Sequence, residues 1–284
     1  MQRTFLAKLR ANGVYYLIGS LLLAVGIPLY QVAILIPQGY SSALAATGSG
    51  HYTPYLGWIF RHTGSFLVYR LLLIAAFVCL WSLPFTLFRI IVAQEILGRE
   101  EEDEESEDET EDEEDKDDAE DEEEEAESAA LLAEAWRGKG FAVLAAWMGL
   151  VGIVVFAFAT LASTTYLTIT SFTSAATVLP ASLPTLSSLF TILTYTVGGG
   201  LLGLSCLLFG VVISRAGLKL WPGIWVAFGY AAILLTAFLI SSAVGVATVS
   251  NESQSIFTTP AILLFALWAF WFGLMLVRLK PETT

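Results

Sequence analysis

The stretch FAVLAAWMGLVGIVVFAFATL, from Phe141 to Leu161, contains no charged residue. About 20 consecutive apolar residues are enough to cross the hydrocarbon core of a bilayer as a helix. Lipid offers no hydrogen-bond partner to the backbone, so a spanning segment satisfies its own N–H and C=O groups by forming an α-helix. This stretch therefore predicts a transmembrane helix and an integral membrane protein.

Five other stretches have the same apolar character. The six predicted spans cover residues 14–36, 71–88, 141–161, 189–213, 224–246 and 260–277. The chain is 14% charged, against about 25% in soluble domains. The alternation of apolar and polar residues that is typical of β-barrel strands is absent from these stretches. The predicted fold is therefore all-α, a polytopic membrane protein with a six-span transmembrane helix bundle.

A strongly acidic segment separates spans two and three. It reads GREEEDEESEDETEDEEDKDDAEDEEEEAESAA, from Gly98 to Ala130. Residues 100–127 hold 23 of the chain's 27 acidic residues and a single basic one, Lys116. The formal net charge of −13 therefore divides into −22 for this run and +9 for the rest of the chain. Because like charges repel, we predict a disordered acidic loop here.

These features divide the chain into three parts. After the acidic loop, Leu131, Leu132, Ala135 and Trp136 share one helical face, and Gly138 and Gly140 follow them. This pattern predicts a short interfacial helix that ends at the two glycines. The three parts are residues 1–97 (spans one and two with their outer loop), 98–130 (the acidic loop) and 131–284 (the interfacial helix and spans three to six).

The placement of Lys and Arg predicts the orientation. With the N-terminus inside, only Arg61 and Arg70 of the 14 basic residues fall on outer loops. An excess of basic residues marks the cytoplasmic side, so we expect both termini and the acidic loop to be cytoplasmic, with the chain in the plasma membrane. The first apolar run is longer than the roughly 7–15 residues of a signal-peptide core, so we expect it to stay as an anchor.

Three roles are open for the acidic loop: a solvated spacer, a docking arm for a basic cytoplasmic protein, and a gate folded against the basic inner rim. Its carboxylates would also attract divalent cations loosely. The segment between Arg99 and Arg137 contains no glycine, which an EF-hand loop needs at its sixth position. The residues that we expect to carry docking are spread along the run: Glu100, Asp103, Asp108, Asp112, Asp118 and Glu122.

The predicted spans contain few ionisable side chains. No Asp, Glu, Lys, Arg or His occurs between Lys139 and Arg215. Ionisable residues within a membrane usually mark proton or ion paths, so their absence argues against a proton-coupled transporter and an intramembrane protease. The sequence contains no phosphate loop, GxSxG, HExxH or paired cysteine ligands. We therefore expect no enzymatic activity, no cofactor and no nucleic-acid binding.

Other residues indicate packing or a pathway. Gly199 and Gly203 form a small-xxx-small pair that lets two helices approach closely, within the bundle or between two copies. Pro28 and Pro84 are expected to kink spans one and two. Gln31 lies near the first kink and is the candidate residue for a pathway wall.

The outer stretch from His51 to Arg70 contains both histidines and many aromatic residues. We interpret it first as a belt of interfacial aromatics in which Arg61 and Arg70 extend toward water. The alternative is a vestibule in which these two arginines bind an anion. A metal site at His51 and His62 would require a folded-back loop, because 11 residues of helix separate them by about 16 Å.

The leading functional hypothesis is a non-catalytic membrane interaction or assembly protein that uses its acidic loop to bind a basic cytoplasmic partner. The alternative is a passive channel or permease for a neutral or apolar small solute, walled by spans one, two and four. The sequence indicates no particular oligomeric state.

Overall fold

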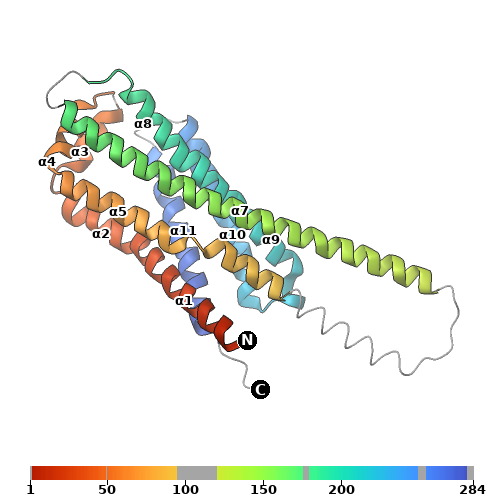
Figure 1. The fold of residues 1–284 in the computed structure, drawn as a ribbon. Helices are drawn as coiled ribbons and strands as arrows, with labels where there is room; N and C mark the ends of the chain where they lie inside the picture. Colours follow the sequence, from red (N-terminus) through yellow and green to blue (C-terminus); the bar gives the residue numbers. More distant parts are fainter. Residues whose placement is uncertain (1, 49, 95–119, 175–178, 249–253, 280–284) are drawn as a thin grey trace.

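The computed structural model describes residues 2–48, 50–94, 120–174, 179–248 and 254–279 (Figure 1). Over these ranges the chain forms helices and no strand. Six helical segments in these ranges are long and apolar enough to cross a membrane, which confirms the predicted all-α class and matches the six predicted spans in number. These segments are Ala7–Leu35, Thr63–Gln94, Gly140–Thr173, Leu183–Leu218, Gly223–Thr248 and Thr258–Arg278.

The first span is interrupted by π-helical turns on both sides of Pro28. Proline has no N–H, and its ring clashes with the carbonyl of the residue four positions earlier, so a regular α-helical ladder cannot continue through it. Wider π turns absorb the mismatch, and they lie on both sides of Pro28, where we expected a kink. In order, the span consists of α1 (Gln2–Leu21), η1 (Leu22–Gly26), α2 (Ile27–Tyr30) and η2 (Gln31–Leu35).

The second span is broken near its middle. The helix α5 (Thr63–Leu80) ends before a turn at residues 81–82, and residues 83–94 are helical again. Pro84 lies in the first turn of the second piece, where its missing N–H costs no helical hydrogen bond. The interruption at residues 81–82 lies just before Pro84, where we expected a kink.

The segment between spans one and two is folded. It forms two helices, α3 (Tyr40–Gly48) and α4 (Thr53–Arg61), which cover one end of the bundle (Figure 1). We call the cluster of buried residues at this end the aromatic cap. The indole N–H of Trp58 donates to the carbonyl of Gln38 at 2.7 Å. The cap consists of Leu35, Tyr40, Ala43, Tyr52, Tyr55, Leu56, Trp58, Ile59, Phe66, Leu167 and Leu183.

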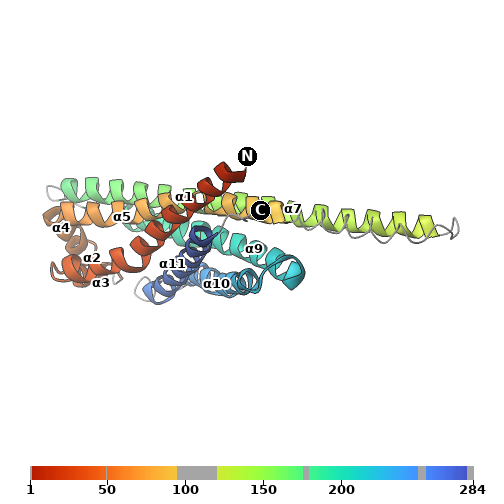
Figure 2. The ribbon, with the colours of Figure 1, turned by 90° about the horizontal axis from the view of Figure 1, so that it is seen from below.

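The third span belongs to a helix much longer than predicted. The helix α7 (Glu120–Ser174) has 55 residues, and Figures 1 and 2 show it extending past the rest of the bundle at the end opposite the aromatic cap. The prediction that a separate interfacial helix ends at Gly138 and Gly140 is wrong, because α7 continues through both. A glycine inside a helix costs only about 1 kcal/mol relative to alanine.

The start of α7 also revises the predicted limits of the acidic loop. Residues 120–130, which we expected to be disordered, are helical, whereas the preceding part of the loop, residues 98–119, lies outside the described residues. The segment AALLAEA, residues 129–135, consists of strong helix formers. Acidic residues in a first helical turn are also stabilised by the helix dipole.

The last three spans form the other half of the bundle. Gly217, with φ 61° and ψ −154°, starts the turn between spans four and five, and the N–H of Trp221 donates to its carbonyl at 3.1 Å. This short turn makes the two spans antiparallel neighbours, as predicted. The elements are α8 (Leu183–Thr191), η3 (Ile192–Gly198) and α9 (Gly199–Leu220) in span four, then α10 (Gly223–Thr248) and α11 (Gln254–Arg278).

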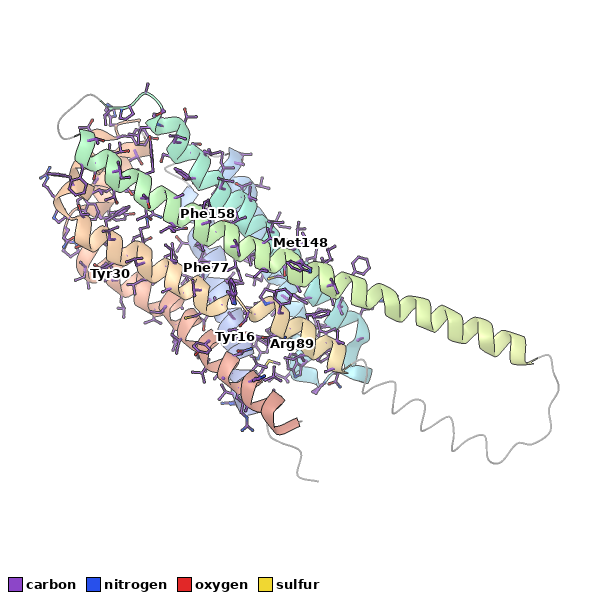
Figure 3. All side chains as sticks on the ribbon, in the orientation of Figure 1. Tyr16, Tyr30, Phe77, Arg89, Met148 and Phe158 are labelled. Carbon is purple, nitrogen blue, oxygen red and sulfur yellow. The ribbon has the colours of Figure 1, made fainter. Side chains whose placement is uncertain are left out.

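Aromatic rings and glycines together pack the centre of the bundle. Phe77 lies between helices (Figure 3) and stacks on Phe156 with ring centroids 4.0 Å apart. At three crossings two glycines face each other, and a Cβ added to either one would lie 2.7–3.3 Å from the carbonyl oxygen of the other. The pairs are Gly13 with Gly273, Gly152 with Gly198, and Gly210 with Gly229.

Candidate functional site

The start of α7 separates the residues predicted to bind a basic partner into two groups. Glu122 lies in the first turn of this helix. The helix continues without a break from the acidic run into span three, which starts at Gly140. At 1.5 Å per residue, the part before Gly140 is about 30 Å long. Five of the predicted docking residues lie outside the described residues: Glu100, Asp103, Asp108, Asp112 and Asp118.

The two glycines predicted to mediate helix packing have different surroundings. A Cβ added at Gly203 would lie 3.2 Å from the Cβ of Leu239 on α10. One added at Gly199 would meet nothing within 4 Å. The close approach to α7 is made instead by the preceding residue, Gly198, whose added Cβ would lie 3.1 Å from the carbonyl oxygen of Gly152.

Gln31, the candidate for a pathway wall, links spans one and two. Its side-chain Nε2 donates to the hydroxyl of Tyr69 on α5 at 2.9 Å. The ring of Tyr69 also contacts Tyr40 of the aromatic cap, with centroids 6.2 Å apart. Through Tyr69, Gln31 therefore belongs to a polar cluster around Arg70, which follows Tyr69 on α5.

The two outer arginines have different environments. Arg61 is exposed at the end of α4, and its Nε donates to the carbonyl of Gly57 at 3.3 Å. Beside it, His62 stacks on Trp58 with centroids 5.2 Å apart. Arg70 is partly buried, and its Nε is enclosed without a hydrogen-bond partner. The exposed Arg61 fits the belt interpretation, whereas the enclosed Arg70 does not.

Aromatic groups surround the guanidinium of Arg70. Its Cζ lies 5.3 Å from the ring centroid of Phe66 and 5.8 Å from that of Tyr69. Cation–π contacts of this kind stabilise a cation without neutralising it. Four tyrosines lie in the neighbourhood of the guanidinium: Tyr40, Tyr55, Tyr69 and Tyr195.

These tyrosines do not supply a counter-charge. Burial, and then the neighbouring phenol of Tyr55, raise the pKa of Tyr40 well above its ordinary value of 10, so its hydroxyl stays neutral. A protonated phenol is an uncharged hydrogen-bonding group. Among the residues whose side chains the structure describes there is no Asp or Glu. Within this part of the chain, Arg70 therefore carries an uncompensated positive charge.

Arg70 borders a pocket of about 230 Å³ between α5 and α7. Three threonines of α7 line the pocket: Thr164, Thr165 and Thr168. The first two donate to carbonyls of their own helix, but the Oγ1 of Thr168 is buried without a partner. The remaining lining is aliphatic: Leu67, Leu71, Ile74, Leu161 and Ile169.

A second polar cluster, not predicted from the sequence, joins spans one and two toward the other end of the bundle. Tyr16 is fully buried and lies next to the second piece of span two (Figure 3). Its hydroxyl is 2.9 Å from Oγ of Ser82 and 2.7 Å from Oγ1 of Thr86. Asn12 donates to the same Thr86 oxygen at 3.1 Å. Because the bonds cross between helices, only the packed bundle reveals them.

Replacing Tyr16 by phenylalanine is expected to reduce the free energy of unfolding by about 1 kcal/mol, because the two side-chain hydrogen bonds of its hydroxyl are lost. Tyr15→Phe is the matched control, since Tyr15 is 57% exposed on the same helix. Equilibrium unfolding in mild detergent measures both variants. Equal stability of the two would contradict a stabilising role for the cluster.

Comparison with protein-family models, curated proteins and solved structures finds no match for this chain. Its function is therefore argued from its own features. They are the acidic run that continues into α7, the π-helical turns in spans one and four, and the Arg70 pocket.

Proposed function

We propose that the protein is a non-catalytic membrane interaction or assembly protein whose acidic segment, residues 98–130, binds a basic cytoplasmic partner. The observation that carries this proposal is the continuity of α7, which joins the acidic run to span three in a single helix. The helical part of the run therefore projects from the bundle in a defined direction (Figure 2). Pre-organised groups bind with a smaller loss of conformational freedom.

The charge distribution supports the same proposal. The acidic run has a formal charge of −22, whereas the rest of the chain has +9. If the acidic residues were a general adaptation of the surface to salt, the other loops would be acidic too. Those loops contain very few acidic residues. Such a concentrated field attracts a partner with clustered Lys and Arg and accelerates its association.

The proposed orientation places this charge in the cytoplasm at the plasma membrane. It rests on the excess of basic residues at the ends of the spans on the side of the termini. The inner leaflet is itself negatively charged. It repels the acidic run, which leaves the carboxylates available to a protein partner.

The test is a detergent pull-down from native membranes with two chains of equal length. In the variant, the acidic residues of 100–127 become Gln or Asn, and Gln at the positions within α7 keeps a good helix former there. We expect the native chain to retain a basic protein that the variant loses, and 500 mM salt to release it because exposed charges are then screened. Identical protein lists would overturn the docking proposal.

A specific observation favours the channel or permease as the second candidate. The π-helical turns η1, η2 and η3 lie in spans one and four, two of the three spans expected to wall a pathway. Turns of this type occur often at functional sites. Solute flux in vesicles of the purified protein, unchanged when the acidic run is neutralised, would support this candidate over docking.

A further inference from the structure

Among the residues whose side chains the structure describes, none is an acidic counter-ion for Arg70. Its Nε–H is enclosed, has no acceptor and lies beside the pocket between α5 and α7. A buried charge is costly unless it is paired and hydrogen-bonded, and the cation–π contacts with Phe66 and Tyr69 do not neutralise it. The unpartnered hydroxyl of Thr168 adds a second donor on the opposite wall. The pocket is thus lined from both helices by a residue with an enclosed donor that lacks an acceptor, and an anionic group is the kind of ligand that would satisfy both donors.

The other walls of the pocket suit a hydrocarbon chain. They are aliphatic and belong to the outer surface of the bundle, since Leu71 is 57% exposed and Ile169 is 58% exposed. In a chain that spans a membrane, this lateral face contacts lipid. A ligand that fits the whole pocket therefore has an anionic group at one end and an aliphatic chain at the other.

The position of Arg70 along the bundle agrees with the depth of a lipid phosphate. Span two has 32 residues and is about 48 Å long, compared with a hydrocarbon core of about 30 Å. When the span is centred, it extends about 9 Å beyond the core at each end. Arg70 is seven residues from the first residue of the span, Thr63, or about 10 Å along the axis. Its guanidinium therefore lies near the boundary between hydrocarbon and head groups.

We propose that this pocket is a binding site for a membrane phospholipid, with the phosphate on Arg70 and Thr168 and an acyl chain along the aliphatic wall. Arginine suits a phosphate because its planar guanidinium can donate two parallel hydrogen bonds to it. The lipid would supply the missing counter-charge and join α5 to α7. This site is independent of the acidic run and does not rest on the docking proposal.

The experiment measures lipid retained by the full-length, detergent-purified protein with native mass spectrometry. Phosphatidylglycerol is compared with diacylglycerol of the same chains, which lacks the phosphate, and with glycerol phosphate, which lacks the chains. Arg70→Gln removes the charge, and Arg61→Gln is the matched control because Arg61 is an exposed arginine on the adjacent helix. Thr168→Val removes the second donor and provides a test if Arg70→Gln does not fold.

We expect the native chain to retain one phosphatidylglycerol in preference to diacylglycerol. Arg70→Gln should weaken this retention about ten-fold, and Thr168→Val about three-fold, as the loss of a charged and a neutral hydrogen bond predicts. Arg61→Gln should leave it unchanged. Equal retention of phosphatidylglycerol and diacylglycerol, or equal effects of the two arginine variants, would overturn the proposal. If the protein retained glycerol phosphate as well as it retains phosphatidylglycerol, the pocket would be a site for a soluble anion, and the assignment to a lipid would be overturned.

Discussion

Replacing Gly152 by alanine is expected to lower the free energy of unfolding by about 1–3 kcal/mol, which is the cost of overpacking a tight interface. The added Cβ would lie 2.9 Å from the carbonyl oxygen of Gly198 and 3.0 Å from the backbone nitrogen of Leu202. Both are backbone atoms, so no side-chain rotation can relieve the contact. The helix α7 must instead move away from span four.

The cost would extend to interactions on the same interface. The hydroxyl of Ser205 donates to the carbonyl of Ala145 at 2.7 Å across these two helices. A displacement of α7 would lengthen this bond, whose atoms are shielded from water. Equilibrium unfolding in mild detergent, compared between native and variant chains, gives the difference in free energy.

Gly199→Ala is the matched control and should act in the opposite direction. An added Cβ there meets nothing within 4 Å, so alanine adds no clash. Alanine is also a better helix former than glycine by up to about 1 kcal/mol, so a small gain in stability is expected. If the two alanine variants unfolded alike, the close contact at Gly152 would not be what stabilises this interface.

Gly198 and Gly199 also show how much of the fold can be predicted from the sequence. The six spans follow from apolar length, because the bilayer thickness sets a minimum number of residues. The rotation of each helix about its axis does not follow from length. Neighbouring residues on a helix point about 100° apart, so the glycine motif could not distinguish Gly198, which packs on α7, from Gly199, which does not.

The continuity of α7 was missed for a related reason. Local signals at Gly138 and Gly140 favour an end, but they are weak compared with the tendency of a long helix to propagate. The helices α3 and α4 were missed because each has only nine residues, and their stability comes from packing in the aromatic cap.

The Arg70 pocket could be predicted only in part. The sequence indicated that Arg70 is one of two outer basic residues, and an anion vestibule was one of the two interpretations. Its surroundings include tyrosines from α3, α4, α5 and η3, which the fold brings together. The facing hydroxyls come from α7, about 95 residues further along the chain. Contacts between such distant segments leave no local pattern in the sequence.

The helix α7 connects the two features that we associate with function. Its first turns belong to the acidic run, and its last turns carry Thr164 and Thr168 in the Arg70 pocket. The proposed protein partner and the proposed lipid therefore contact opposite ends of the same helix. The close packing at Gly152, between these ends, fixes α7 against span four.

Replacing Gly217 by alanine is expected to destabilise the bundle by about 1–3 kcal/mol through the backbone alone. Gly217 has φ 61° and ψ −154°, a combination that is open essentially to glycine only. An added Cβ would meet nothing within 4 Å, so the cost would not come from a steric contact with the neighbouring helix.

The turn that begins at Gly217 determines how α10 returns along α9, because its carbonyl accepts the N–H of Trp221. An alanine that shifts φ to a negative value would break this hydrogen bond and redirect the chain. Gly223→Ala is the matched control, since Gly223 lies at the other end of the same turn and does not have positive φ. Its added Cβ would be 3.8 Å from Leu218, an ordinary contact, so unfolding in detergent should show no loss for this variant. A similar loss in both variants would indicate that the turn is sensitive to any added methyl group, and the backbone explanation for Gly217 would fail.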